Sequence, residues 1–169
     1  MKKILVLITI IIIFFIKPVD SVINNTKIDK KKTIYNVENI KEKPNFGIIK
    51  IPKINLNRKF YNNGDIDKNI IMLPISDYPD TEKSLLVLAA HSGTGIAAYF
   101  NYLYKLDLGD KVVINYNDNN IEYKIIDIYL QEKDGDVEIY KISNKRTLIL
   151  ITCTNYNKTK QTIYVAIDI

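Results

Sequence analysis

The sequence predicts an all-β domain, either a closed barrel or a sandwich, over residues 46–169. Short apolar runs rich in Ile, Val, Leu and Tyr recur along this region. Pro, Gly, Asn and Asp separate the runs about every ten residues, which is typical of such β domains. One segment alone, 95–106, carries apolar residues at roughly helical spacing, so one helix is expected there. The chain of 169 residues suffices for one domain with a substantial core.

The expected strands follow from local signals. The runs 46–51 and 69–73 each stop at a proline, and the run 58–62 precedes the turn "NGD". The runs "SLLVLAAH" (84–91) and "TLILITC" (147–153) are almost continuously apolar, which is typical of strands buried on both faces. The remaining expected strands are 111–116, 121–132 and 162–169, the first two joined by the hairpin turn "NDNN".

The first 23 residues favour a membrane helix. "MKK" precedes thirteen uncharged residues, 4–16, and positive charge before an apolar run places the amino end in the cytoplasm. The run is shorter than the ~20 residues of a typical span. Because Lys17 can snorkel and no small-residue cleavage site follows, we interpret 1–23 as an uncleaved signal-anchor. A cleaved signal peptide and a buried core helix are the alternatives.

Residues 24–45 are polar and lysine-rich, and they are expected to link the membrane segment to the domain at 46–169. The protein is therefore predicted to be a single-pass membrane protein with an extracellular domain. Its net charge of +5 comes almost wholly from lysine. Because there is no arginine-rich face or aromatic-basic motif, nucleic acid is not expected as a partner, whereas an anionic membrane or cell-wall surface suits this charge.

One cysteine and one histidine, Cys153 and His91, stand out. Structural cysteines of exported proteins come in pairs, so an unpaired one is either an incidental core residue or a reactive thiol. Each of the two residues ends an apolar strand run, where a side chain meets solvent on a rigid support. A neighbouring imidazole can activate a thiol as a nucleophile, so the pair is a candidate catalytic dyad. A metal site is less well supported, because no further ligands occur at metal spacing.

The residues that surround this pair resemble the sortase family, the cysteine transpeptidases of Gram-positive bacteria. Three blocks carry the resemblance, in the family's order and spacing. They are "GIIKIPKINLNRKFYN" (47–62), "LLVLAAHSGTGIAAYFNYLYKLDLGDKVVI" (85–114) and "LILITCTNYNKTKQTIYVA" (148–166). The resemblance covers the whole predicted domain.

The resemblance implies an eight-stranded β-barrel with one or two short helices. It implies cleavage of a C-terminal sorting signal, usually of the LPxTG type, with Cys153 forming a thioacyl enzyme. An amine of a peptidoglycan precursor, or a pilin lysine, would accept the acyl group. His91 would act as general acid and then as general base. No cofactor is implied.

One departure from the family concerns an arginine that usually precedes the last strand. The alignment places Gln161 there, and no arginine follows Cys153. An amide donates a hydrogen bond without charge, so Gln161 would be a weaker substitute. Lys160 and, in the preceding loop, Lys158 are further candidates, although neighbours on a regular strand face opposite sides. Arg146, at the other end of its strand, is not expected to substitute.

Two further positions lie within the family motifs, and at one of them Ala90 stands where the family often has glycine, another small residue. Ala90, before His91, and Thr152, before the cysteine, are expected to contact or place the substrate. A cation site at the acidic stretch "SDYPDTEKS" (76–84) is an alternative, but carboxylates in a polar loop are more often solvated, so no metal is expected.

Three functions are compatible with these residues. The favoured one is an active, membrane-anchored sortase. The missing arginine motivates the second, a catalytically weak or inert sortase-fold binding module on the cell surface. The third is a different exported cysteine hydrolase, in which water replaces the amine.

Overall fold

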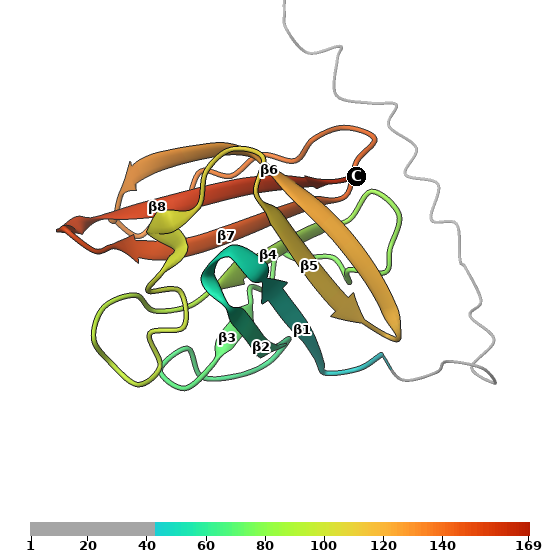
Figure 1. The fold of residues 1–169 in the computed structure, drawn as a ribbon, viewed down its shortest axis with the longest axis horizontal. Helices are drawn as coiled ribbons and strands as arrows, with labels where there is room; N and C mark the ends of the chain where they lie inside the picture. Colours follow the sequence, from blue (N-terminus) through green and yellow to red (C-terminus); the bar gives the residue numbers. More distant parts are fainter. Residues whose placement is uncertain (1–42) are drawn as a thin grey trace, which may run out of the picture. The chain divides into compact units, whose positions relative to one another are not determined.

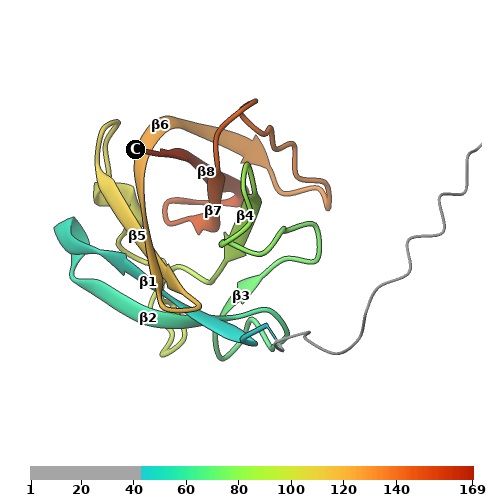
Figure 2. The same cartoon turned by 90° about the vertical axis from the view of Figure 1, so that its right-hand side faces the viewer.

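The computed structural model describes residues 43–169. They form a closed β-barrel whose strands run in the order β1-β2-β3-β4-β7-β8-β6-β5, and Figure 2 shows this ring of strands. The eight-stranded barrel that the sequence resemblance implied is therefore confirmed. The strands are β1 (Phe46–Ile51), β2 (Leu56–Tyr61), β3 (Ile70–Met72), β4 (Leu85–Ala89), β5 (Lys111–Tyr116), β6 (Asn119–Glu132), β7 (Thr147–Thr154) and β8 (Asn157–Asp168). Two 3-10 helices complete the fold, η2 (Pro52–Ile54) and η3 (Leu103–Lys105).

The pairing of β4 with β7 brings the two candidate catalytic residues to one edge of the barrel. These strands are parallel, with Ala89 opposite Ile151 in the register. Because the carboxyl ends of parallel strands meet at the same edge, His91, two residues beyond Ala89, is level with Cys153, two residues beyond Ile151. Figure 1 shows β4, β7 and β8 next to one another, with the β7–β8 hairpin extending beyond the other strands.

The predicted hairpin between β5 and β6 is also confirmed. Its two central residues, Asn117 and Asp118, have φ values of 52° and 61°. Positive φ at both positions defines a type I′ turn, whose twist matches that of the flanking strands. Asn and Asp tolerate this conformation better than most residues, so the short local motif was sufficient to place the turn.

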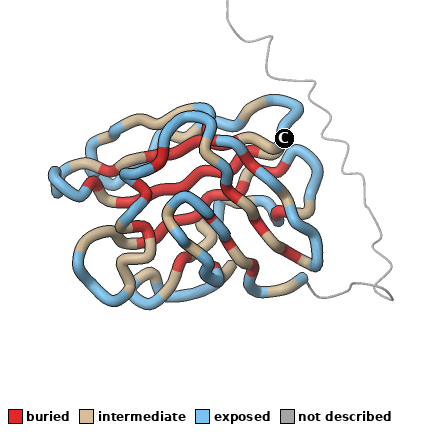
Figure 3. The backbone as a smooth tube through the Cα atoms, viewed as in Figure 1, coloured by how far each residue is buried: buried red, intermediate tan, exposed pale blue. Residues whose placement is uncertain are grey.

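The strands β4, β7 and β8 are buried on both faces. Alternate side chains point into the barrel, where the main core contains Leu86, Leu88, Leu148, Leu150 and Tyr164. The other face of the same strands carries a second apolar cluster, which consists of Val87, Ala89, Ile149, Ile151, Ile163 and Val165. Partly buried side chains from the β2–β4 region and the β6–β7 loop pack on this cluster. Figure 3 shows the resulting buried stretches along these strands.

The helix expected at 95–106 does not form, and that prediction was wrong. The structure shows a series of turns that ends in η3. The N–H of Phe100 donates to the carbonyl of His91, and the side chain of Asn101 accepts from the N–H of Gly93, so tertiary contacts replace the helical ladder. The apolar spacing reflects burial of Phe100, Leu103 and Leu106 in the main core. Aromatic residues and Asn are also modest helix formers.

The predicted membrane segment 1–23 and the linker up to residue 42 lie outside the described residues. Within residues 43–169, no helix is long and apolar enough to cross a membrane.

Three tyrosines make the barrel sensitive to alkaline pH. Burial raises the pKa values of Tyr116 and Tyr164 to about 12, and it raises the pKa of the fully buried Tyr123 as well. The neutral phenol is therefore favoured in the folded state. Its contribution to stability is fully present below the unfolded pKa of about 10 and is lost as pH rises through the folded pKa.

We expect phenolate absorbance of the folded protein to develop in at least two phases, the later one near pH 12, and the melting temperature to fall over the same interval. The twelve tyrosines in denaturant should titrate together near pH 10. A single phase near pH 10 from the folded protein would show that these phenols are not buried as described.

Candidate active site

Cys153 is the penultimate residue of β7, and its side chain is partly exposed. In the register it lies opposite Gln161 of β8. Because side chains alternate along a strand, it shares a face with Ile149 and Ile151, and so belongs to the outer face of the sheet rather than to the barrel interior. The apolar cluster below it gives the sulfur a rigid support.

Hydrogen bonds clamp the end of β4 to the end of β7. The N–H of Ala90 donates to the carbonyl of Ile151 at 3.3 Å, and the hydroxyl of Thr152 donates to the carbonyl of Ala90 at 2.9 Å. The hydroxyl of Ser92 donates to the carbonyl of Cys153. Ala90 and Thr152, which were expected to contact substrate, are buried and serve here to hold the two strand ends together.

His91 follows β4 by two residues, and its imidazole Nε2 lies 2.8 Å from Oδ1 of Asp67. Asp67 belongs to the loop between β2 and β3. Among residues 43–169 no hydrogen bond joins the imidazole to the thiol of Cys153. No sequence signal pointed to Asp67, because it lies 24 positions before the histidine in a stretch that is typical of a polar turn.

Gln161, which aligns with the family's arginine, anchors a loop instead of presenting its amide to the cysteine. It is 9% exposed, and its Nε2 donates to the carbonyls of Glu132 and Asp136 at 3.5 and 3.3 Å. An amide has two N–H donors, so these bonds account for both. Gln131 on β6 acts in the same way, because its Oε1 accepts the N–H of Glu138 at 3.1 Å. Both glutamines therefore fasten the start of the β6–β7 loop to the sheet.

The structure does not bring Lys160 or Arg146 to the cysteine. Lys160 lies opposite Glu132 in the register, on the face away from Cys153, and its ammonium pairs with that carboxylate at 3.1 Å. Arg146 precedes β7, at the far end of the strand from the thiol, and pairs with Asp168 at 3.4 Å.

A cation that the sequence did not single out does reach the thiol. The ammonium Nζ of Lys133 lies 3.4 Å from Sγ of Cys153. Lys133 follows the last residue of β6, and its backbone N–H donates to the carbonyl of Thr159 at 2.7 Å. The only hint in the sequence was the position of this lysine at the end of a strand.

Comparison with known protein families shows to which family the chain belongs. The model of the Sortase domain matches residues 49–168, which is most of the described region. The chain is a member of the sortase family. The resemblance found in the sequence is thereby confirmed. Sortases as a family are cysteine transpeptidases that act on sorting signals. Cys153, the one cysteine of the chain, is the residue of the right type at the right strand end.

Solved sortase structures share the fold. Sortase A from Corynebacterium diphtheriae is 23% identical, with a TM-score of 0.67 over 76% of this chain and 62% of that one. The lid mutant of Streptococcus agalactiae sortase C1 is 25% identical, with a TM-score of 0.65 over 77% and 71%. A Clostridium perfringens sortase D5 transpeptidase is 22% identical, with a TM-score of 0.63 over 74% and 79%. This chain thus spans less than two thirds of the corynebacterial one. No curated protein matches the sequence significantly.

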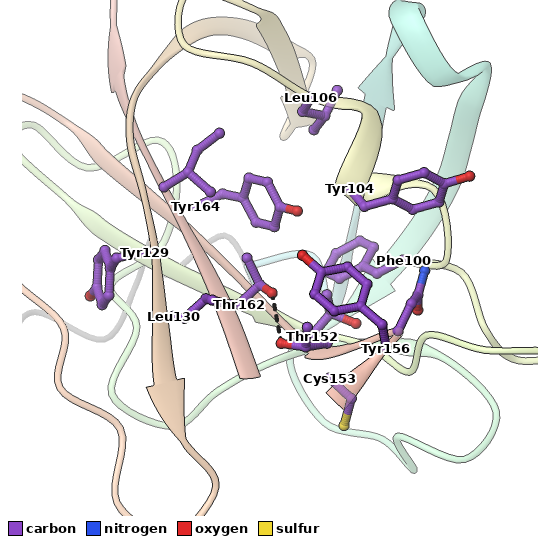
Figure 4. A pocket seen from close by; sticks show the side chains of 13 residues that line it. Phe100, Tyr104, Leu106, Tyr129, Leu130, Thr152, Cys153, Tyr156, Thr162 and Tyr164 are labelled. Atoms are coloured by element: carbon purple, nitrogen blue, oxygen red, sulfur yellow. Dashed lines mark hydrogen bonds between the residues drawn. The ribbon is translucent and has the colours of Figure 1, made fainter. Parts of the chain in front are cut away.

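A cavity of about 370 Å³ opens beside Cys153. Aromatic and apolar side chains dominate its lining, including Phe100, Tyr104, Leu106, Tyr156 and Tyr164. Thr154 and Thr162 join β7 to β8 across it by a hydroxyl pair at 3.0 Å. Figure 4 shows the sulfur of Cys153 at the rim, pointing away from these rings, as expected from its position on the outer face.

The aspartates of the acidic stretch 76–84, considered above as a cation site, form hydrogen bonds and ion pairs with protein groups. Asp77 accepts the N–H of Leu85 at 2.9 Å and pairs with Lys141 at 3.3 Å. The bond from Leu85 lowers the pKa of Asp77, with a smaller contribution from Lys141. Asp80 accepts from Asn117 and pairs with Lys43. Within residues 43–169, no group of three His, Cys, Asp or Glu side chains could hold a metal ion.

Proposed function

We propose that the protein is a membrane-anchored sortase that cleaves an LPxTG-like sorting signal and joins the protein bearing it to an amine of a cell-wall precursor. The observation that carries this proposal is the placement of Cys153 and His91 at adjacent strand ends of a sortase barrel. The thiol is accessible to a peptide because Cys153, near the end of β7, is partly exposed.

The first half of the reaction forms a thioester. The thiol proton of Cys153 passes to the imidazole of His91. The resulting thiolate attacks the carbonyl carbon of the scissile threonine, a C–S bond forms, and the carbonyl π electrons move to oxygen. The tetrahedral intermediate collapses, the C–N bond breaks, and the imidazolium of His91 gives its proton to the departing amine.

The second half reverses these steps with a different amine. The acceptor amine attacks the thioester carbonyl while the neutral imidazole of His91 takes its proton. The C–S bond then breaks, an amide forms, and the sulfur of Cys153 returns to its starting state. A peptidoglycan precursor or a pilin lysine would supply the amine.

His91 must turn toward the substrate for this sequence. In the structure its Nε2 faces Asp67, and the histidine side chain is 43% exposed, so rotation is not blocked by the core. Catalytic hydrogen bonds often form only in the complex with substrate, because the substrate bridges the two groups.

The location of the enzyme rests on the first 45 residues. The apolar run at 4–16 and the lysines before it support a signal-anchor, with the barrel outside the cytoplasm. A protease-protection experiment on inverted and right-side-out membrane vesicles tests this topology. We expect cleavage of the barrel only in right-side-out vesicles.

Incubation with a sorting-signal peptide, with and without an added primary amine, separates the three candidate functions. A sortase converts the peptide into the amine conjugate. A cysteine hydrolase releases the free acid and forms no conjugate with the amine. An inert binding module leaves the peptide intact, even though the thiol of Cys153 still reacts with an alkylating agent.

Replacing Asp67 with alanine should slow transpeptidation modestly. The carboxylate accepts the imidazole N–H of His91 at 2.8 Å and so holds the ring in one orientation and one tautomer. Both side chains are well exposed, so we expect a decrease of about 2- to 5-fold in kcat/KM. Steady-state kinetics checks this, with Glu82→Ala, which removes an exposed carboxylate from the loop between β3 and β4, as the control. Equal rates for the Asp67 variant and wild type would show that the pair has no catalytic role.

A further inference from the structure

Three strands present side chains to one face around the thiol. Cys153 lies opposite Gln161, and Gln161 lies opposite Gln131 of β6. Directly paired residues of antiparallel strands point to the same face, and residues two apart on one strand do so as well. Lys133 is two residues beyond Gln131, so it belongs to the face of Cys153.

The position of Lys133 is fixed by its backbone. Its N–H donates to the carbonyl of Thr159 at 2.7 Å, which continues the β6–β8 ladder by one rung beyond Glu132 and Lys160. From this anchored backbone the ammonium comes within 3.4 Å of Sγ of Cys153. Among the ion pairs of residues 43–169 none involves Lys133, so its charge is free to act on the site.

Two of the other cations near the ends of β7 and β8 are engaged elsewhere, and in the described residues no hydrogen bond joins the third, Lys158, to the thiol. Lys160 pairs with Glu132 on the opposite face, and Arg146 pairs with Asp168 at the other end of the strand. Gln161 is neutral, and both its donors are held by backbone carbonyls. In the described part of the chain, Lys133 is thus the cation in contact with the thiol.

We infer that Lys133 is the active-site cation of this sortase, in the place where the family usually has an arginine. Its ammonium stabilises negative charge on the sulfur of Cys153, and it stays beside that charge as the C–S bond forms and breaks. This inference rests on the proposed function for its catalytic consequence, whereas the effect on the sulfur can be measured without any substrate.

The first test is the rate of alkylation of Cys153 by iodoacetamide, a neutral reagent, as a function of pH in the full chain in detergent. Only the thiolate reacts, so the rate reports its population. We expect Lys133→Gln to react about 3- to 10-fold more slowly near neutral pH and to reach the wild-type rate only at higher pH, since an exposed charge pair is partly screened. Lys133→Arg should restore the wild-type profile.

Two controls separate the local charge from general effects. Lys124→Gln makes the same change in net charge on the same strand, but near the β5–β6 turn, and should leave the profile unchanged. At about 1 M salt the difference between Lys133→Gln and wild type should shrink, because the Debye length falls to about 3 Å. Identical profiles for Lys133→Gln and wild type at low salt would overturn the inference.

The second test is the rate of acyl-enzyme formation with a peptide that wild type accepts. Bound peptide excludes water and strengthens the charge interaction, so we expect Lys133→Gln to lose about 10- to 100-fold, with Lys133→Arg retaining most of the rate. Equal acylation by Lys133→Gln would exclude a catalytic role for Lys133 while leaving the sortase proposal intact. Failure of wild type to acylate would instead count against the sortase proposal, and the alkylation profiles would still decide the role of Lys133 at the sulfur.

Discussion

Replacing Cys153 with alanine should reduce transpeptidation to the level of the reaction without enzyme, a loss of about 10⁴-fold or more. The sulfur is the only thiol in the chain, so no neighbouring nucleophile can take over the acyl group. The side chain is partly exposed at the end of β7, and its removal leaves the apolar cluster below it intact. The measurement is the rate at which a peptide and an added amine form their conjugate.

Cys153→Ser is the matched control for shape, because it keeps a small side chain with one polar atom. The serine hydroxyl is a much weaker nucleophile than a thiolate, so this variant should also be inactive while binding peptide normally. Unchanged melting temperatures of both variants would show that the barrel is intact. Residual conjugate formation by Cys153→Ala above background would place the nucleophile elsewhere.

Replacing His91 with glutamine should lower kcat/KM by about 100- to 10,000-fold, the usual contribution of a general acid and base. Glutamine can still donate a hydrogen bond to Asp67, so the strand end should remain in place. What is lost is the group that protonates the departing amine and deprotonates the acceptor. The measurement is single-turnover acylation, followed by discharge of the acyl-enzyme with an amine.

The two phases of that experiment report separate proton transfers. Both should slow in His91→Gln, because the imidazole acts in each. The control is Ser92→Ala, which tests the adjacent clamp to the carbonyl of Cys153 without removing a titratable group. Normal acylation by His91→Gln would mean that another group protonates the leaving amine.

Most of the strands could be predicted because their signals are local. Alternating or continuous apolar runs bounded by turn residues placed β1, β5 and β7 to within a residue or two. The segment 95–106 could not be predicted in this way. Its apolar spacing was compatible with a helix. Its path is instead determined by hydrogen bonds to His91 and Gly93, which precede the expected helix and are too far away in sequence to be helical partners.

The site residues also divide into those with a local sequence signal and those placed by tertiary contacts. Cys153 and His91 could be found because each ends an apolar run and each is the only residue of its type. Lys133 and Asp67 could not, because their contacts depend on the β6–β8 register and on the path of the loop between β2 and β3. The roles of Gln161 and Lys160 likewise depend on which face each side chain occupies and on what it meets there.

Intact-protein mass spectrometry of the full chain with LPxTG-like peptides tests the central claim most directly. We expect an adduct with the mass of the peptide's acyl fragment, absent from Cys153→Ala and discharged into a conjugate when an amine is added. A protein that forms no adduct with any such peptide, although iodoacetamide still labels Cys153, would contradict the account of this chain as an active sortase of LPxTG-like signals.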